Sequence, residues 1–356
     1  NEMLDLMIGT SFFANNLFTT VPDVFKACEN LNMLGFKANQ LESFDEDILP
    51  LSINWLILTD NKLKKLPDSI GKLTKMRKFP LAGNRLETLP SSMQNLKNLE
   101  LLRLSANNLQ EIPSWLLELP KLSWLAFSGN PCVETPLISS KVIDIKDLEV
   151  QELLGQGASG EIFKAYSKDL ESSVAIKFFK GAITSDGYAQ DEMNACLALK
   201  EHDNLIKVIG RINGDEKEGL LLEYITKEFV NLGNPPTFET CTRDTYHDEK
   251  QFTCASIERI AKSIVSVASH LHTHNLIHGD LYAHNVLIND SDICYLGDFG
   301  AASFYDSKNV NYEKIEVRAF GCLLDDMLSR CSDTDNPEYK KLIDLKEKCM
   351  DEDVQS

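Results

Sequence analysis

Three oxygen-bearing side chains at fixed spacing are the residues of this chain best placed to do chemistry. Asp280 lies in the run HGDLYAHN, residues 278–285, which ends at Asn285, and Asp298 follows thirteen positions later. An aspartate can accept the proton of a hydroxyl group, while amide and carboxylate oxygens suit Mg²⁺. Because Mg²⁺ can bridge phosphate oxygens, these three side chains are candidates for magnesium-dependent chemistry on a nucleotide.

A glycine-rich run and a lysine are placed to hold the phosphates. The run LGQGASGEI spans residues 154–162, and the later run VAIK ends at Lys177. A G-x-G-x-x-G pattern also occurs in dinucleotide-binding turns, which require a helix directly afterwards. Residues 162–166 are strand-like instead, so we expect a hairpin whose backbone amides close over phosphates while Lys177 contacts their oxygens.

Together these motifs resemble those of a eukaryotic-type protein kinase. The resemblance implies that Asp280 orients and deprotonates a substrate hydroxyl, and that Asn285 and Asp298 hold Mg²⁺. It also implies a catalytic ion pair between Lys177 and a glutamate of a nearby helix.

Two neighbouring acidic residues compete for that ion pair. Glu192 and Asp191 both lie in a helical pattern whose apolar side carries Ala195, Cys196 and Leu199. The phase of the helix places Glu192 on the apolar side. We therefore expect Glu192 to pair with Lys177, with Asp191 as the alternative.

The resemblance further implies a set of ATP contacts drawn from the glycine-rich run, the strands after it and the stretch 219–225. Leu222 would lie behind the adenine, although an ordinary buried strand shows the same apolar pattern. The implied contacts are Gly155, Gly157, Ala158, Ser159, Gly160, Ile162, Ala175, Lys177, Leu222, Glu223, Ile225 and Leu287.

Several positions depart from the family pattern. Gly279 replaces the arginine that commonly binds a phosphorylated loop, so we expect no switch of that kind. Tyr282 replaces the lysine of serine/threonine kinases, His284 stands where tyrosine kinases place arginine, and Glu316 replaces the usual anchoring aspartate. Residues 300–316 are short for a peptide-docking segment.

The last part of the chain differs in two further ways. An irregular insertion, 227–253, contains the run CTRD at 241–244, which is either a structural clamp or a regulatory contact. The pattern after residue 342 resembles a late helix of the family, so we expect a minimal or truncated C-terminal lobe.

The first part of the chain is a repeat array. Apolar strands cannot bury one face alone, so such units stack and share a core, and each asparagine is expected to bond turn backbone. The pattern resembles the leucine-rich repeat, with about six repeats. Asparagines recur every 22 or 23 residues at Asn16, Asn39, Asn61, Asn84, Asn107 and Asn130. Asp45 stands where other repeats have the proline that closes the turn.

Outward-facing strand residues of the repeats predict a protein-binding concave surface. Exposed aromatic and basic side chains suit such a surface, although both tryptophans could equally pack against neighbours. The residues expected on it are Trp55, Ile57, Lys78, Leu101, Arg103 and Trp124.

Composition narrows the class of protein. Residues 1–146 hold 15 Lys+Arg against 16 Asp+Glu, whereas residues 147–356 hold 21 against 38. An acidic second part disfavours nucleic acid as a partner. Nine scattered cysteines without a C-x-x-C pair indicate reduced thiols and a cytoplasmic location, with delivery as a secreted effector left open. No apolar run is long enough for a membrane span.

We therefore expect an α/β leucine-rich-repeat solenoid over residues 1–132, a linker at 133–148, and an α+β two-lobed protein-kinase-like domain. Its lobes are expected at 149–225 and 226–356. The expected activity is ATP- and Mg²⁺-dependent phosphorylation of protein Ser/Thr hydroxyls, with the repeats recruiting a substrate or regulator. A pseudokinase scaffold and a small-molecule kinase are the alternatives.

Overall fold

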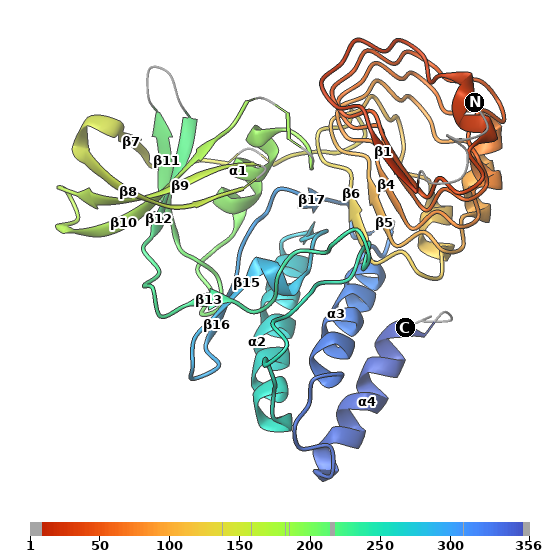
Figure 1. Cartoon of the computed structure of the whole chain (residues 1–356). Helices are drawn as coiled ribbons and strands as arrows, with labels where there is room; N and C mark the ends of the chain where they lie inside the picture. Colours follow the sequence, from red (N-terminus) through yellow and green to blue (C-terminus); the bar gives the residue numbers. More distant parts are fainter. Residues whose placement is uncertain are drawn as a thin grey trace.

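The computed structural model describes residues 9–136, 138–157, 159–181, 183–184, 186–213, 218–308 and 310–351. Two differently built parts follow one another along the chain (Figure 1). Among the helices in these ranges, none combines the length and the apolarity needed to cross a membrane.

The first part is a six-stranded parallel sheet whose strand order follows the sequence, β1 to β6. Each strand has only three residues, because the chain turns back within every repeat unit. The strands are β1 Thr10–Phe12, β2 Met33–Gly35, β3 Trp55–Ile57, β4 Lys78–Pro80, β5 Leu101–Arg103 and β6 Trp124–Ala126.

Short 3₁₀ helices return the chain between most of these strands. A proline directly precedes each helix, because its fixed φ and missing N–H suit a helix start. The helices are η1 Asp23–Ala27, η2 Asp68–Lys72, η3 Ser91–Asn95 and η4 Ser114–Glu118. The fully described stretch between β2 and β3, where Asp45 replaces the proline, contains no such helix.

Buried asparagines satisfy the backbone of the repeat turns, as predicted. The Asn61 amide donates to the carbonyls of Phe36 at 2.8 Å and Leu58 at 3.0 Å, and its oxygen accepts from the Leu41 N–H at 3.0 Å. These bonds tie each repeat to its neighbours. Equivalent bonds are made by Asn84, Asn107 and Asn130.

The second part begins with a sheet in the order β7-β11-β12-β10-β9-β8. Its strands are β7 Val142–Asp144, β8 Leu148–Gln156, β9 Gly160–Ser167, β10 Ser172–Phe179, β11 Val208–Asn213 and β12 Glu218–Glu223. Helix α1, Ala189–Ala198, lies between β10 and β11 in the sequence. The expected linker 133–148 thus contributes a strand, β7, which pairs with β11.

The remaining residues form three long helices with small sheets between them (Figure 1). Helix α2 begins at Cys254, because Thr253 caps it by accepting the N–H of Ser256 at 3.1 Å. The elements are α2 Cys254–Thr273, α3 Glu313–Leu328 and α4 Pro337–Met350, with β13 Val230–Asn231, β14 Leu276–Ile277, η6 Ala283–Asn285, β15 Val286–Ile288, β16 Cys294–Leu296 and β17 Ser303–Phe304.

The two parts pack against each other through the repeat strands. Leu101 and Trp124 join the apolar core of the helical region, and β6 contacts α3 (Figure 1). The expected exposure of the concave surface is therefore wrong for three of its residues. Leu101 and Arg103 are each 4% exposed and Trp124 is 1% exposed, because residues of the second part cover them.

Candidate active site

The 278–285 loop connects β14 to β15 and is anchored by a buried carboxylate. Glu316 of α3 accepts the N–H groups of His278 at 2.7 Å and Gly279 at 3.2 Å through one oxygen. Its second oxygen lies 2.6 Å from Nε2 of His272. The glutamate therefore provides the anchor that the resemblance assigned to this position.

The loop brings Asp280, Asn285 and Asp298 into one neighbourhood. The Asn285 amide donates to the Asp280 carbonyl at 2.9 Å and to Asp280 Oδ2 at 3.0 Å. The N–H of Gly297 donates to the Asn285 carbonyl at 2.8 Å, which places the next residue, Asp298, beside the loop. Asp298 has a φ of 53°, a left-handed conformation that is uncommon outside glycine and concentrates at functional sites.

Lys177 of β10 forms its ion pair with Glu192 of α1. Burial lowers the pKa of Lys177, but the carboxylates of Glu192 and Asp298 raise it by more, so the ammonium group stays charged. Asp298 Oδ1 lies 3.8 Å from the Lys177 ammonium. Asp191 takes no part in this pair: its Oδ2 is buried without a hydrogen-bond partner, and burial raises its pKa to about 6.

A cavity of about 440 Å³ opens between the sheet that contains β8 to β12, helix α1 and the Asp298 region. A volume of this size suits a small organic ligand. The expected site residues that line it are Gly157, Ser159, Gly160, Ile162, Lys177, Glu192, Leu222, Glu223 and Asp298. Gly155, Ala175, Ile225, Asp280, Asn285 and Leu287 are not among its lining residues, and Ala158 lies outside the described residues.

The glycine-rich turn leaves space for a phosphate chain. A Cβ built on Gly160 would lie 2.3 Å from the Phe178 carbonyl, so only glycine fits there, whereas Gly155 and Gly157 face open space. Open backbone beside a charged lysine suits phosphate oxygens, and the Asn285 and Asp298 side chains offer the hard oxygen donors that Mg²⁺ prefers. The residues present therefore fit a magnesium nucleotide.

Comparison with known proteins assigns both parts of the chain. Residues 148–320 match the family model for the protein kinase domain, and residues 52–109 and 74–131 match that for the leucine rich repeat. The chain joins leucine-rich repeats to a protein kinase domain.

Curated relatives match about half of the chain at low identity. The Serine/threonine-protein kinase TIO of Arabidopsis thaliana is 26% identical over 174 residues, which cover 48% of this chain and 12% of that protein. Ephrin type-B receptor 4 of Homo sapiens is 27% identical over 174 residues, which cover 48% of this chain and 16% of the receptor. The chain thus spans a small fraction of the length of these relatives.

One residue of the repeat region enters the active site, and no sequence pattern pointed to it there. The Arg103 guanidinium of β5 pairs with Asp280 Oδ1, donates to the Gly279 carbonyl at 3.0 Å, and contacts Asp186 Oδ1 at 2.8 Å. Burial raises the pKa of Asp280, but Arg103 first and His284 second lower it by more, so the net pKa lies below 3.8. The kinase domain's proposed base is therefore ionised and occupied.

The insertion run 241–244 is a structural clamp that links three segments. Thr242 donates to Glu100 of the repeat region, and Asp244 accepts the His284 N–H at 3.0 Å and lies 2.7 Å from its Nδ1. Arg243 reaches a carboxylate of α3 at 3.0 Å. His284 is thus committed to Asp244, which explains why a histidine stands at a position where tyrosine kinases place arginine.

A histidine beneath the catalytic loop should make the stability of the kinase domain depend on pH. Burial lowers the pKa of His272, but its hydrogen bond and charge interaction with Glu316 raise it by more, above 6.5. The protonated His272 therefore stabilises the folded protein. This contribution is complete below pH 6.5, the ordinary pKa of histidine, and is lost as the pH rises through the higher pKa of His272 in the folded protein.

His272→Gln should therefore lower the free energy of unfolding by about 1–3 kcal/mol at pH 5.5, with a smaller loss at pH 9. Urea denaturation of both proteins across this pH range measures the difference. The exposed His247→Gln variant is the matched control. A loss that is equal at both pH values would argue against a charged His272–Glu316 pair.

Proposed function

We propose that this chain is an ATP-dependent protein kinase that transfers the γ-phosphoryl group to Ser/Thr hydroxyls of proteins. The observation that carries the proposal is the Lys177–Glu192 ion pair, which lines the cavity together with Asp298. The name of the Arabidopsis relative, a serine/threonine-protein kinase, supports the same hydroxyl class.

Each side chain of the site has a distinct part in this reaction. Glu192 holds the Lys177 ammonium against the phosphate oxygens, where its charge offsets theirs. Asn285 and Asp298 would hold Mg²⁺, which neutralises charge on the phosphates when bound. Asp280 accepts the proton of the substrate hydroxyl. Asn285 orients the Asp280 carboxylate by donating a hydrogen bond to Oδ2.

The repeat region is proposed to form a short solenoid that recruits a substrate or regulator. Its six parallel strands and its asparagine ladder support this arrangement. Trp55 and Ile57 are half-buried, and Lys78 lies over the Trp55 ring at 4.3 Å. Trp55 and Ile57 lie on β3, and β4 separates this strand from β5 and β6, which carry Arg103 and Trp124.

A scaffold function is the second candidate, and one observation favours it. Arg103 occupies the carboxylate that would accept the hydroxyl proton. A scaffold has no need of nucleotide, whereas a kinase must bind it, so nucleotide binding separates the two.

Mg-ATP should raise the melting temperature of the full chain. Binding stabilises a folded protein by RT ln(1 + [L]/Kd), or about 2.7 kcal/mol at a hundredfold excess over Kd. Lys177→Met should remove most of the shift between samples with and without Mg-ATP, because the phosphates lose their cation. Lys168→Met, which removes an exposed lysine in the turn after β9, is the control and should keep the shift.

No shift at millimolar Mg-ATP in the unaltered chain would favour the scaffold. Measuring each variant against its own nucleotide-free sample cancels any change in basal stability.

A further inference from the structure

The end of the repeat sheet covers the face of the catalytic loop that a protein hydroxyl must approach. Arg103 is 4% exposed, and its guanidinium bridges Asp280, the Gly279 carbonyl and Asp186. Asn285 holds the other oxygen of Asp280 at 3.0 Å. Both carboxylate oxygens of the base therefore already have partners.

The adjacent repeat strand, β6, extends this cover. The Trp124 ring stacks on Tyr282 with centroids 4.3 Å apart and planes 8° from parallel. Its indole N–H donates to the Leu281 carbonyl at 3.1 Å. The next residues of the repeat, Phe127 and Ser128, donate their N–H groups to Ser303 Oγ of β17, the strand after the Asp298 region.

Gly279 shows that the loop is shaped to this contact. Its φ is 71°, and an added Cβ would lie 2.6 Å from the Leu125 carbonyl of β6 and 2.6 Å from the Ala301 carbonyl. A larger residue, such as the arginine of the family pattern, would collide with the repeat backbone. The departure at this position is therefore explained by the packing of the repeats.

The nucleotide cavity lies apart from this contact. Its lining residues run from Gly157 to Phe299, and none belongs to the repeat region. In this arrangement the repeats cover the catalytic loop, where a protein hydroxyl must approach, but they leave the nucleotide cavity uncovered.

We propose that the repeat region inhibits its own kinase domain by holding Asp280 through Arg103 and covering the catalytic loop with Trp124. This inference rests on the proposed function. The closed arrangement binds Mg-ATP but admits no protein substrate, and phosphorylation requires β5 and β6 to leave the loop.

The first test removes the cation. Arg103→Ala leaves the carboxylates of Asp280 and Asp186 without their partner. Loss of one partner of a buried charge pair typically weakens the contact between two surfaces by more than about tenfold, so the repeat region should leave the catalytic loop more readily. With [γ-³²P]ATP and dephosphorylated casein as the probe, the variant should label casein at least ~10-fold faster than the unaltered chain. An equal or lower rate overturns the inhibition.

The second test locks the contact. Ser123 Oγ of the repeat region lies 3.9 Å from Cys322 Sγ of α3, so Ser123→Cys places two thiols within reach of a disulfide. Diamide takes up the two protons and two electrons that the thiols release. The oxidised variant should label casein at least ~10-fold more slowly than the same protein after reduction, while its Mg-ATP melting shift stays unchanged.

Controls separate this inference from the proposed function. A Ser123→Cys/Cys322→Ser double variant, treated with diamide in the same way, should show no loss on oxidation. Equal labelling by the locked and reduced forms overturns the inhibition alone. Absence of labelling by Arg103→Ala, with the melting shift retained, overturns the kinase proposal together with the inhibition.

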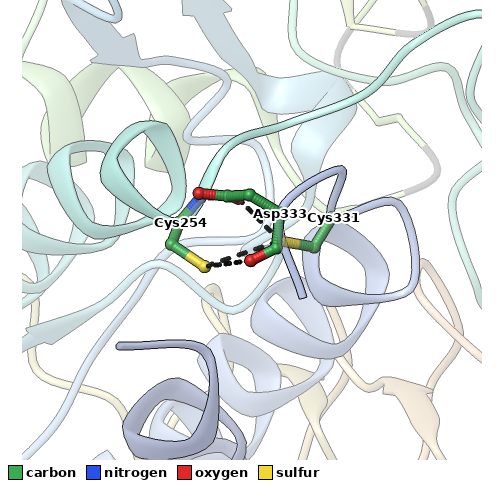
Figure 2. A group of neighbouring side chains, drawn as sticks. All are labelled: Cys254, Cys331 and Asp333. Atoms are coloured by element: carbon green, nitrogen blue, oxygen red, sulfur yellow. Dashed lines mark hydrogen bonds between the residues drawn. The ribbon is translucent and has the colours of Figure 1, made fainter. Parts of the chain in front are cut away.

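A second, independent feature is a cluster of two thiols and a carboxylate at the start of α2. Figure 2 shows Cys254, Cys331 and Asp333 pointing toward one another. The two Sγ atoms are 3.6 Å apart, and Cys331 Sγ lies 3.3 Å from Asp333 Oδ1. Cys254 is buried, whereas the other two are half-buried and offer a path from solvent.

The spacing of these atoms matches that of ligands around a tetrahedral metal ion. Zn–S bonds of about 2.3 Å at tetrahedral angles separate two sulfurs by about 3.8 Å, close to the 3.6 Å observed. Two thiolates and one carboxylate are also ligands that suit Zn²⁺. We infer that this cluster binds one Zn²⁺, with water as the fourth ligand and release of the two thiol protons.

Metal uptake by the EDTA-treated full chain tests the zinc site. After incubation with ZnCl₂ and desalting, the chain should retain about one zinc, and Cys254→Ser/Cys331→Ser should retain almost none. Cys28→Ser, which removes a distant cysteine, is the control. Co²⁺ added to the unaltered chain should give thiolate charge-transfer absorption, a readout that needs no variant.

The zinc inference fails if the desalted chain holds no zinc, if the double variant holds as much, or if Co²⁺ gives no thiolate band. Uptake should strengthen with rising pH, because the ion must displace the two thiol protons.

Discussion

Asp280→Asn is expected to slow phosphoryl transfer to casein by about 10²–10⁴-fold while the Mg-ATP melting shift remains. Asparagine keeps the size of the side chain but cannot accept the hydroxyl proton. The nucleotide cavity does not include Asp280, so binding of ATP should survive the change. Because labelling by the closed chain is slow, the comparison uses long incubations with [γ-³²P]ATP.

The matched control is Asp290→Asn, which makes the same chemical change at an exposed aspartate outside the site. It should label casein as the unaltered chain does. Equal labelling by Asp280→Asn and the unaltered chain would show that another group accepts the proton, or that the label comes from a different activity.

Gly279→Ala is expected to cost about 2–5 kcal/mol in the free energy of unfolding, because it combines backbone strain with a collision. Its φ is 71°, and the new Cβ would lie 2.6 Å from the Leu125 carbonyl. The repeat strand or the catalytic loop must shift to relieve this contact. Urea denaturation of the full chain measures the loss.

Gly181→Ala isolates the collision from the strain. Gly181 also has a φ of 71°, but no atom lies within 4 Å of an added Cβ. It should therefore lose only the strain energy, about 1–2 kcal/mol. Equal losses for both variants would mean that the repeats do not press on the catalytic loop at Gly279.

The repeat frame was predictable because its cause is local. One asparagine and a few apolar positions recur within each unit of 22 or 23 residues, and each unit bonds its neighbour in the same way. Departures were visible for the same reason, as at Asp45, where the short helix is missing from the described stretch. The phase of a single helix was likewise enough to choose Glu192 over Asp191.

The contact between the repeats and the kinase domain was not predictable from local patterns. Arg103 and Asp280 lie 177 residues apart, and nothing in either motif encodes how two folded parts dock. The outward position of Arg103 on its strand was expected correctly, but the surface that covers it comes from elsewhere in the chain. Gly279 was the one residue in the sequence that reflected this packing. We interpreted it only as the loss of the arginine that binds a phosphorylated loop.

The same limit applies to the cysteine cluster and to β7. Cys254 and Cys331 are 77 residues apart and show no metal-binding spacing in the sequence. The strand β7 has only three residues and pairs in parallel with β11, far along the chain, so the stretch around it read as a linker.

The most direct test compares Arg103→Ala with Arg103→Ala/Asp280→Asn in the transfer of phosphate from [γ-³²P]ATP to casein. The single variant has an open site with its base, whereas the double variant has an open site without it. The single variant should label casein faster than the unaltered chain, and the double variant should label it about 10²–10⁴-fold more slowly than the single variant. Equal labelling by the single and double variants would contradict a kinase that acts through Asp280 and is restrained by Arg103.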